Sequence, residues 1–395
     1  MDSARPLDAT RVLPDYTGGG LLNLMASLEA ACGGAPTAPV AAQLPPASLA
    51  GVHNLVLVIL DGLGYRYLTT RTPDSALARH LRGALTSVFP STTASAITTT
   101  LTGRAPAEHG LTGWHLWLAE TGAVTAVLPQ RARDGGALLP TDPAALFPCA
   151  SFFDRIARPA VVVSPQAIID TVFNTRHCGR AVKRPYAAPA DFFPAVARAV
   201  HETSVPTLIY AYYPEFDGLA HAHGVGSAEV AREFTALDAA WETFLERIAD
   251  TDTTVVLTAD HGFIDGPPER LIDLDAHPRL TALLARPLCG ERRVAYCYLK
   301  DGADADFRAY VETELGHATE LIARDALLAS GWFGPGPVHP RLADRVGDYA
   351  LVMRADWTIK DWLPEEKRHP MIGVHAGLTA DEMLIPLVVH TTAAA

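Results

Sequence analysis

Five short segments of the chain are apolar from end to end and rich in β-branched residues. A strand with one face in water alternates polar and apolar side chains, whereas a strand buried on both faces of a parallel sheet is apolar throughout. The segments therefore predict a mostly parallel central sheet. They cover residues 55–60, 160–163, 207–213, 253–258 and 384–389.

Helical patterns lie between these segments. The clearest covers residues 227–249, where apolar side chains recur every three or four positions. We expect Ser227 to cap this helix, and Glu229 is favourable in its first turn. Strands that alternate with helices predict an α/β sandwich. In such sheets, ligands bind just beyond the carboxyl ends of the strands.

The 395 residues are long enough for more than one domain. We assign residues 51–266 and 371–395 to a catalytic α/β core. Residues 1–50 are expected to be an N-terminal extension that packs on this core, with a short helix over 20–31.

The segment 267–370 has a different pattern and is predicted to be an inserted α+β cap. Residues 293–299 and 348–354 alternate like exposed antiparallel strands, and residues 303–315 are helical in pattern. Because the chain returns to the core after this insertion, we expect the cap to fold over the strand ends and help to select the substrate.

The charge balance excludes some partners. There are 32 basic and 44 acidic side chains, a net charge of −12. This charge disfavours sequence-independent binding of nucleic acid. The sequence shows neither a basic-then-apolar leader nor an apolar run near the roughly 18 residues that cross a bilayer. We expect a cytoplasmic protein that binds neither duplex nucleic acid nor a membrane, and the oligomeric state stays open. Five scattered cysteines predict no disulfide framework.

Aspartate and histidine side chains follow the ends of several predicted strands. Three carboxylates, three imidazoles and one hydroxyl are what two divalent cations need if each takes three protein ligands and keeps open positions. The sequence therefore predicts one dinuclear metal site. Its six carboxylate and imidazole ligands are Asp61, Asp217, His221, Asp260, His261 and His375.

The hydroxyl is expected from the segment 89–95, which is rich in threonine and serine. A divalent metal can lower the pKa of a bound oxygen by several units, which makes a hydroxyl a usable nucleophile. A helix starting near residue 93 would also offer its first amides to a substrate oxyanion. Both features suit phosphoryl transfer. Spacing alone does not rank the candidates, which are Ser91, Thr92, Thr93 and Ser95.

Taken singly, some of these residues have simpler explanations. Asp61 could cap a helix or form a turn, and Asp217 with His221 could be a surface pair on a helix. A purely structural role is harder to assign to Asp260 and His261. Burial of a charged carboxylate and an imidazole directly after an apolar strand costs free energy unless a partner neutralises them. Their occurrence together at strand ends favours a joint site.

The sequence resembles the alkaline phosphatase superfamily, and within it the nucleotide pyrophosphatase/phosphodiesterase branch. The resemblance extends from Asn54 to His390, and the cap is its least recognisable part. It implies a three-layer α/β sandwich. The motifs that carry it are Leu60-Asp61-Gly62, Phe89-Pro-Ser-Thr-Thr93, Thr102-Gly103, His109-Gly110, Asp217 with His221, Ala259-Asp260-His261-Gly262 and the segment from His375 to Pro386.

The resemblance also implies roles. Thr93 would be the nucleophile, would bridge toward one metal and would form a covalent phosphothreonine on phosphodiester substrates. The two divalent ions would be zinc in the first instance, although manganese or iron would also suit the ligands. One ion would be held by Asp217, His221 and His375, and the other by Asp61, Asp260 and His261.

The sequence differs from the phosphodiesterase branch at one motif that affects substrate preference. That branch usually places an asparagine shortly after the His-Gly step to hold a phosphoryl oxygen, whereas this chain has Leu111-Thr-Gly-Trp-His115. Thr112, Trp114 or His115 is expected to replace it. Besides a phosphodiesterase, the sequence leaves open a phosphonate hydrolase, a phosphomonoesterase or a mutase of the superfamily, and a metal-stabilised binding scaffold that is no enzyme. It contains no Cys-x-Pro-x-Arg run of a sulfatase.

Overall fold

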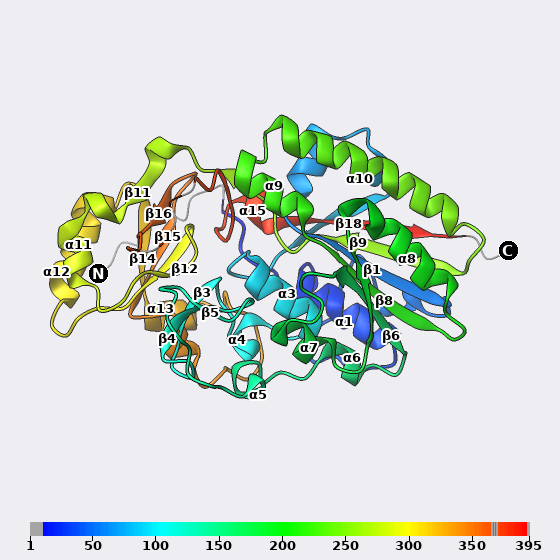
Figure 1. Ribbon diagram of the computed structural model, residues 1–395, viewed down its shortest axis with the longest axis horizontal. Coiled ribbons are helices and arrows are strands. Elements are labelled where there is room, and N and C mark those ends of the chain that lie inside the picture. The colour runs from blue at the N-terminus through cyan, green and yellow to red at the C-terminus, as the bar shows by residue number, and fades with distance from the viewer. Residues whose placement is uncertain (1–10, 365, 367, 369, 393–395) are drawn as a thin grey trace.

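The computed structural model describes residues 11–364, 366, 368 and 370–392. Its centre is a seven-stranded sheet in which six strands run in one direction and only β18 runs against them (Figure 1). The mostly parallel sheet is therefore confirmed. In spatial order the strands are β2 (Leu81–Thr86), β18 (Leu384–Thr391), β9 (Thr253–Thr258), β1 (Asn54–Leu60), β8 (Thr207–Tyr213), β6 (Ala160–Pro165) and β7 (Val182–Tyr186).

The direction of β18 differs from the prediction for residues 384–389. This strand pairs antiparallel with both β2 and β9. It directly follows the short helix α15 (Ala380–Met383), so the chain enters the sheet at the end where the other strands leave it. A strand between two neighbours is apolar whichever way it runs, and the hydrophobic pattern therefore does not report direction.

Helices cover both faces of the sheet and complete three layers (Figure 1). Ser227 accepts a hydrogen bond from the amide of Val230 and caps the longest helix, as predicted. One face carries α2 (Ala76–Arg79), α8 (Phe192–His201), α9 (Glu215–His223) and α10 (Ala228–Arg247). The other carries α1 (Leu21–Ala31), α3 (Thr93–Thr102), α6 (Phe152–Arg155) and α7 (Val172–Cys178).

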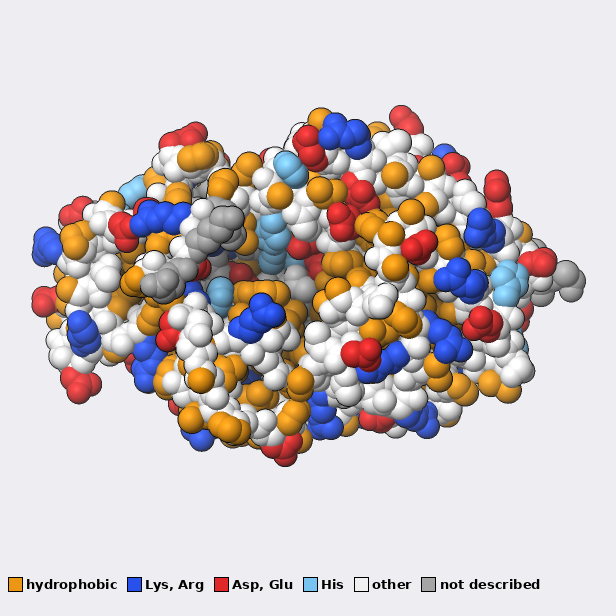
Figure 2. All heavy atoms as spheres, in the orientation of Figure 1, with side chains coloured by type: hydrophobic (Ala, Val, Ile, Leu, Met, Phe, Trp, Pro, Cys, Tyr) orange, Lys and Arg blue, Asp and Glu red, His pale blue; other side chains and the backbone are white. Residues whose placement is uncertain are grey.

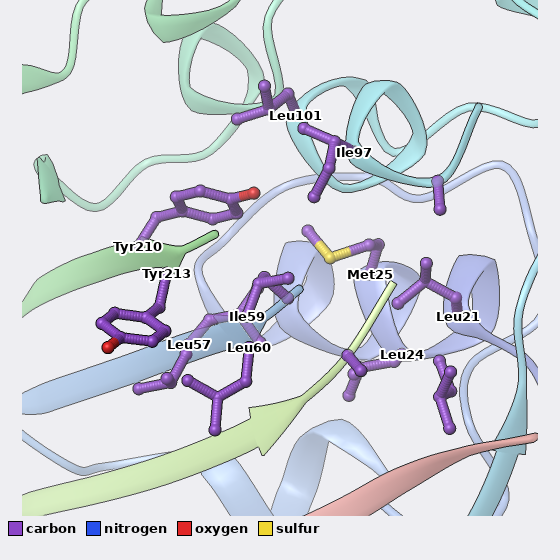
Figure 3. Packing of buried hydrophobic residues seen from close by; sticks show 14 of the residues in the cluster. Leu21, Leu24, Met25, Leu57, Ile59, Leu60, Ile97, Leu101, Tyr210 and Tyr213 are labelled. Carbon is purple, nitrogen blue, oxygen red and sulfur yellow. The ribbon is translucent and has the colours of Figure 1, made fainter. Parts of the chain in front are cut away.

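The helix of the N-terminal segment belongs to the main hydrophobic core. In Figure 3, Met25 of α1 lies between the end of β1 and Ile97 of α3, and Leu24 lies on the opposite side of the same helix. These side chains are buried, and burial of each large apolar side chain contributes about 1.5–3 kcal/mol. Helix α1 thus supports the helix that begins at Thr93.

A second seven-stranded sheet stands beside the first (Figure 1). All its pairings are antiparallel. In spatial order it contains β14 (Thr319–Ala323), β15 (Tyr349–Met353), β13 (Val294–Cys297), β12 (Cys289–Gly290), β3 (His115–Leu118), β4 (Ala123–Ala126) and β5 (Arg131–Ala132).

The second sheet corrects one expectation about the cap and shows which strands accompany it. Strands β13 and β15 are antiparallel as predicted, but they are largely buried and not exposed. Three strands of the sheet, β3 to β5, come from the segment 51–266 that the sequence assigned to the core. They join the insertion because His115 pairs with Gly290 of β12. The domain boundaries themselves stay a prediction.

Short elements complete the molecule. Helices α11 (Pro278–Leu283), α12 (Asp304–Tyr310) and α13 (Arg324–Ala329) accompany the second sheet. The remaining helices are α4 (Pro106–His109), α5 (Pro143–Leu146) and α14 (Leu342–Arg345), and two small sheets pair β10 (Ile264–Asp265) with β17 (Gly373–Val374) and β11 (Leu271–Asp273) with β16 (Thr358–Lys360). Among the described residues, no helix has both the length and the apolar character of a membrane span.

Candidate metal centre

The carboxyl ends of three neighbouring strands bring the predicted ligands together. Strands β9, β1 and β8 are adjacent and parallel, so their carboxyl ends meet at one edge. Asp61 follows β1, helix α9 follows β8 and carries Asp217 and His221, and Asp260 follows β9. The chain returns to the same place after β17, where His375 lies.

Asp217, His221 and His375 form one cluster. The Nε2 atom of His221 lies 3.4 Å from Oδ1 of Asp217 and 3.2 Å from Nε2 of His375. The Nε2 atom of His375 lies 3.9 Å from the same aspartate oxygen. The three groups that the sequence assigned to one ion therefore face a common point.

Asp61, Asp260 and His261 form the second cluster. The Nε2 atom of His261 lies 3.4 Å from Oδ1 of Asp61 and 3.4 Å from Oδ2 of Asp260. It also lies 3.9 Å from Oδ1 of Asp217, so the two clusters adjoin. The hydroxyl of Thr93 lies 3.2 Å from the same His261 nitrogen.

Each imidazole is oriented by a backbone carbonyl on its far side. The Nδ1 atoms of His221, His261 and His375 lie 2.8, 3.1 and 3.2 Å from the carbonyl oxygens of Gly373, Gly262 and Ser91. A proton on Nδ1 that is donated to a carbonyl leaves Nε2 with a lone pair. This arrangement is typical of histidine ligands.

Two of the carboxylates are oriented in the same way. The backbone amides of Gly62 and His261 both donate to Oδ1 of Asp260 at 3.0 Å, and the phenol of Tyr212 donates to Oδ2 of Asp61. The remaining oxygens, Oδ2 of Asp260 and Oδ1 of Asp61, are buried without a hydrogen-bond partner among the described residues. These are the oxygens that face His261.

The donor set fits divalent ions. Oδ1 of Asp217 is a third buried oxygen without a partner in the described part of the chain, and buried polar atoms are rarely left so. Two ligand atoms on one tetrahedral zinc ion lie ~3.3 Å apart when each is ~2.0–2.1 Å from it. The separations of 3.2–3.9 Å within the two clusters are close to that value.

The pKa shifts of the ligand groups also indicate that the site favours cations. Burial, followed by the charges of Asp260 and Asp217, raises the pKa of Asp61 well above its usual value. Burial raises the pKa of Asp217 to about 7, against the opposing effect of His261. Burial also lowers the pKa of His375, and the other two imidazoles add to this. Bound cations would favour the ionised carboxylates and neutral imidazoles.

Two glycines allow the strand ends to approach each other. Gly62 has φ +76°, and a Cβ there would lie 2.4 Å from the ring of Phe263. A Cβ on Gly262 would lie 2.0 Å from the carbonyl oxygen of Asp381. Side chains at these positions would force apart the loops that carry Asp61 and His261.

The structure separates the four hydroxyl candidates. Ser91 donates to the carbonyl of Gly377, Thr92 donates to Glu291, and the hydroxyl of Ser95 is buried inside the core. Thr93 is the first residue of α3 and is partly open to the cavity beside His261. Its hydroxyl is therefore the one placed to reach a substrate at the metal centre.

A cavity of about 350 Å³ lies over the centre, between the two sheets. Figure 2 shows histidine side chains at the bottom of a hollow in this region. Trp114 and His115 line the cavity, and burial, with nearby Arg133 and Lys360, lowers the pKa of His115 to about 3. Thr112 does not line it, and its buried hydroxyl has no partner among the described residues.

Two residues of the site were not predicted. Glu291 lines the cavity and accepts hydrogen bonds from the Thr92 hydroxyl at 2.6 Å and the Trp114 amide at 2.7 Å. Burial raises the pKa of its carboxyl to about 7. The other is Tyr212, whose phenol donates to Asp61. No spacing in the sequence relates either residue to its partner.

Comparison with known families agrees with this geometry. The family model for type I phosphodiesterase / nucleotide pyrophosphatase matches residues 55–377, a range that covers the central sheet apart from β18, all the proposed ligands and the second sheet. The chain belongs to this family. It is thus a phosphoester hydrolase of the alkaline phosphatase superfamily, a family that depends on divalent metal ions. No curated protein matches the sequence.

Solved structures share the fold of this family member. Human and mouse ectonucleotide pyrophosphatase / phosphodiesterase 5 superimpose with TM-scores of 0.63 and 0.61, each with 17% identity over 85% of this chain and 87% of theirs. Phosphonoacetate hydrolase from Sinorhizobium meliloti 1021, in complex with phosphonoformate, has a TM-score of 0.59 and 19% identity over 86% of this chain and 90% of its own. These similarities confirm the predicted fold class.

Proposed function

We propose that the protein hydrolyses small phosphodiesters with nucleotide-like or aryl arms through a covalent phosphothreonine on Thr93. The observation that carries the proposal is the convergence of six ligand groups beside one accessible hydroxyl. Asp217, His221 and His375 would hold one ion, and Asp61, Asp260 and His261 the other, which Thr93 would also approach. A cavity of about 350 Å³ suits a small molecule.

When bound, two ions, zinc in this proposal, would stabilise charge on phosphoryl oxygens and lower the pKa of coordinated oxygens. Thr93 would give its proton to solvent and attack phosphorus while the bond to the leaving ester oxygen breaks, and that oxygen would take up a proton from solvent. Free amides in the first turn of α3 would favour the phosphoryl charge. Water would then attack phosphorus, the bond to Thr93 would break, and the hydroxyl would regain its proton.

A similar structure supports the roles of a threonine and of a nucleotide-like substrate. Mouse ectonucleotide pyrophosphatase / phosphodiesterase 5 was also solved as an inactive threonine-to-alanine variant in complex with AMP. For this chain the proposal takes Thr93 as the corresponding functional group, because it is the hydroxyl beside His261.

The test is hydrolysis by protein loaded with a defined metal. A panel of 4-nitrophenyl phosphodiester, phosphomonoester, phosphonate and sulfate substrates measures the preference, and elemental analysis identifies the metal. Thr93→Ala should lower turnover of the diester at least 10³-fold while two metal ions stay bound. Thr235→Ala, on the exposed face of α10, is the matched control. Unchanged turnover in Thr93→Ala would refute the phosphothreonine.

Hydrolysis of a phosphonate is the second candidate. It is favoured by the likeness to phosphonoacetate hydrolase and by the basic side chains Arg133, Arg292 and Lys360 along the cavity. Thr93 would attack phosphorus as before, the phosphorus–carbon bond would break, and the leaving carbon would take up a proton from solvent. A higher kcat/KM for the phosphonate than for the diester would decide for this candidate.

A further inference from the structure

The turn between β12 and β13 carries three consecutive charged residues that have different surroundings. Glu291 accepts hydrogen bonds from Thr92 and Trp114, next to the proposed nucleophile. Arg293 is fully buried and pairs with Glu382, with Nε 2.9 Å from Oε1. Arg292 lies between these two anchored residues and lines the cavity. The position of its backbone is therefore fixed from both sides.

Arg292 is the basic side chain of the cavity that lacks a counter-ion in the described part of the chain. Arg133 donates to Asp361 at 2.7 Å and to Glu366 at 3.0 Å. Lys360 donates to Glu366 at 2.6 Å. The guanidinium of Arg292 forms no hydrogen bond or ion pair with the described residues, and it lies 5.5 Å from the ring centroid of Trp362.

The environment of Arg292 makes an anion favourable there. The residue is half-buried, and burial lowers the pKa of its guanidinium, against the opposing effect of the Glu366 charge. A partly desolvated cation without a partner gains more from an anionic ligand than a solvated one does. The flat guanidinium next to an indole also presents two parallel N–H groups to a carboxylate or phosphate.

We propose that Arg292 forms an anion subsite that binds a carboxylate or phosphate group on one arm of the substrate. The inference rests on the proposed function and narrows its substrate class to phosphoesters or phosphonates that carry a second negative group. The cavity connects the two positions, since Thr93, Asp217 and Arg292 all line it.

The test compares substrates that differ only in the end of one arm. The probes are 4-nitrophenyl phosphodiesters whose second arm ends in a carboxylate, a phosphate or an uncharged amide. With metal-loaded protein, kcat/KM should be at least tenfold higher for a charged arm than for the amide. The carboxylate and phosphate probes show which anion the subsite prefers.

Arg292→Ala and the similarly sized Arg292→Gln should each reduce this selectivity ratio at least tenfold. Arg279→Ala is the matched control, because Arg279 is an exposed cap arginine beside Tyr310 and outside the cavity. It should keep the wild-type ratio. Thermal unfolding of each variant verifies that the proteins are folded.

The outcomes separate the inference from the function on which it rests. Hydrolysis without preference for a charged arm, or a ratio unchanged in both Arg292 variants, would overturn the anion subsite alone. If no probe is hydrolysed, the proposed function fails. In that case calorimetric binding of the same probes to wild type and Arg292→Gln still decides whether the subsite exists, because equal affinities for all three arms would refute it.

Discussion

At the scale of single residues, Tyr212 orients a proposed metal ligand. Its phenol donates to Oδ2 of Asp61 and leaves Oδ1 facing His261. We predict that Tyr212→Phe weakens binding of one metal ion by about 10–100-fold, the usual effect of losing a group that orients a ligand. Competition with a chelator measures the metal affinity of each variant. Tyr213→Phe is the control, since that phenol bonds to Glu233. Equal affinities in both variants would contradict the role of Tyr212.

The raised pKa of Asp217 predicts how pH affects the metal-free protein. The pKa is 3.8 for an ordinary aspartate and about 7 in the folded chain. A group whose pKa is raised by folding stabilises the fold below its unfolded value, and this stabilisation is lost as pH rises through the folded value. With EDTA, the unfolding temperature should therefore fall between pH 5 and pH 8.

Metal ions and a substitution provide the controls for this pH dependence. Excess zinc should reduce the decrease, because bound cations favour the ionised carboxylates. Asp217→Asn has no carboxyl group at this position, so its metal-free form should show a smaller decrease than wild type. A metal-free protein that becomes more stable from pH 5 to pH 8 would show that the carboxylates do not repel each other as described.

The residues of the metal centre differ in how well they could be predicted from the sequence. The six ligands stand at strand ends or in a recognisable motif, and the structure brings them together. Thr93 could not be chosen from residue type, because Ser91, Thr92 and Ser95 have equivalent hydroxyls. Only the tertiary contacts of those groups distinguish it. Glu291 could not be predicted as a site residue, because its partner Thr92 is 199 positions away along the chain.

At the scale of elements, the ion pair of Arg293 and Glu382 connects the turn before β13 to helix α15, which follows the loop of His375. Both side chains are fully buried, and Glu382 also accepts from the amide of Gly377 at 2.7 Å. We predict that Arg293→Ala lowers the free energy of unfolding by about 3–5 kcal/mol, because it leaves a buried carboxylate unpaired. Urea unfolding measures this change.

A surface ion pair is the control for this prediction. Arg270 pairs with Asp356, and both side chains are partly exposed. Arg270→Ala should change the free energy of unfolding by less than about 1 kcal/mol. If Arg293→Ala is no more destabilising than Arg270→Ala, the buried pair does not hold the two elements together.

Strands were predictable as segments but not in their pairing. A run of apolar residues shows that a strand is buried, and this identified β1, β6, β8, β9 and β18. The direction of β18 depends on the route of the chain after His375, and β3 to β5 join the second sheet through one contact of His115 with Gly290. Neither is encoded in the hydrophobic pattern of the segment itself.

At the scale of the whole molecule, the proposed ligands come from segments that span most of the chain, from Asp61 to His375. Ions that bind only the folded chain stabilise it by mass action, by ~2.7 kcal/mol per site when the free ion is at 100 times its Kd. Zinc should therefore shift the unfolding of the entire core, and not of one loop. Urea unfolding at increasing zinc concentrations measures the shift.

The variant Asp260→Asn tests whether two ions contribute. Oδ1 of Asp260 accepts hydrogen bonds from the backbone amides of Gly62 and His261, and Oδ2 faces Nε2 of His261 within the second cluster. The asparagine keeps the shape of the side chain and removes its charge, so the variant should bind one ion tightly and retain about half of the wild-type shift. An unfolding midpoint that does not respond to zinc in wild type would mean that the six groups do not bind it. A full shift in the variant would place Asp260 outside the metal centre.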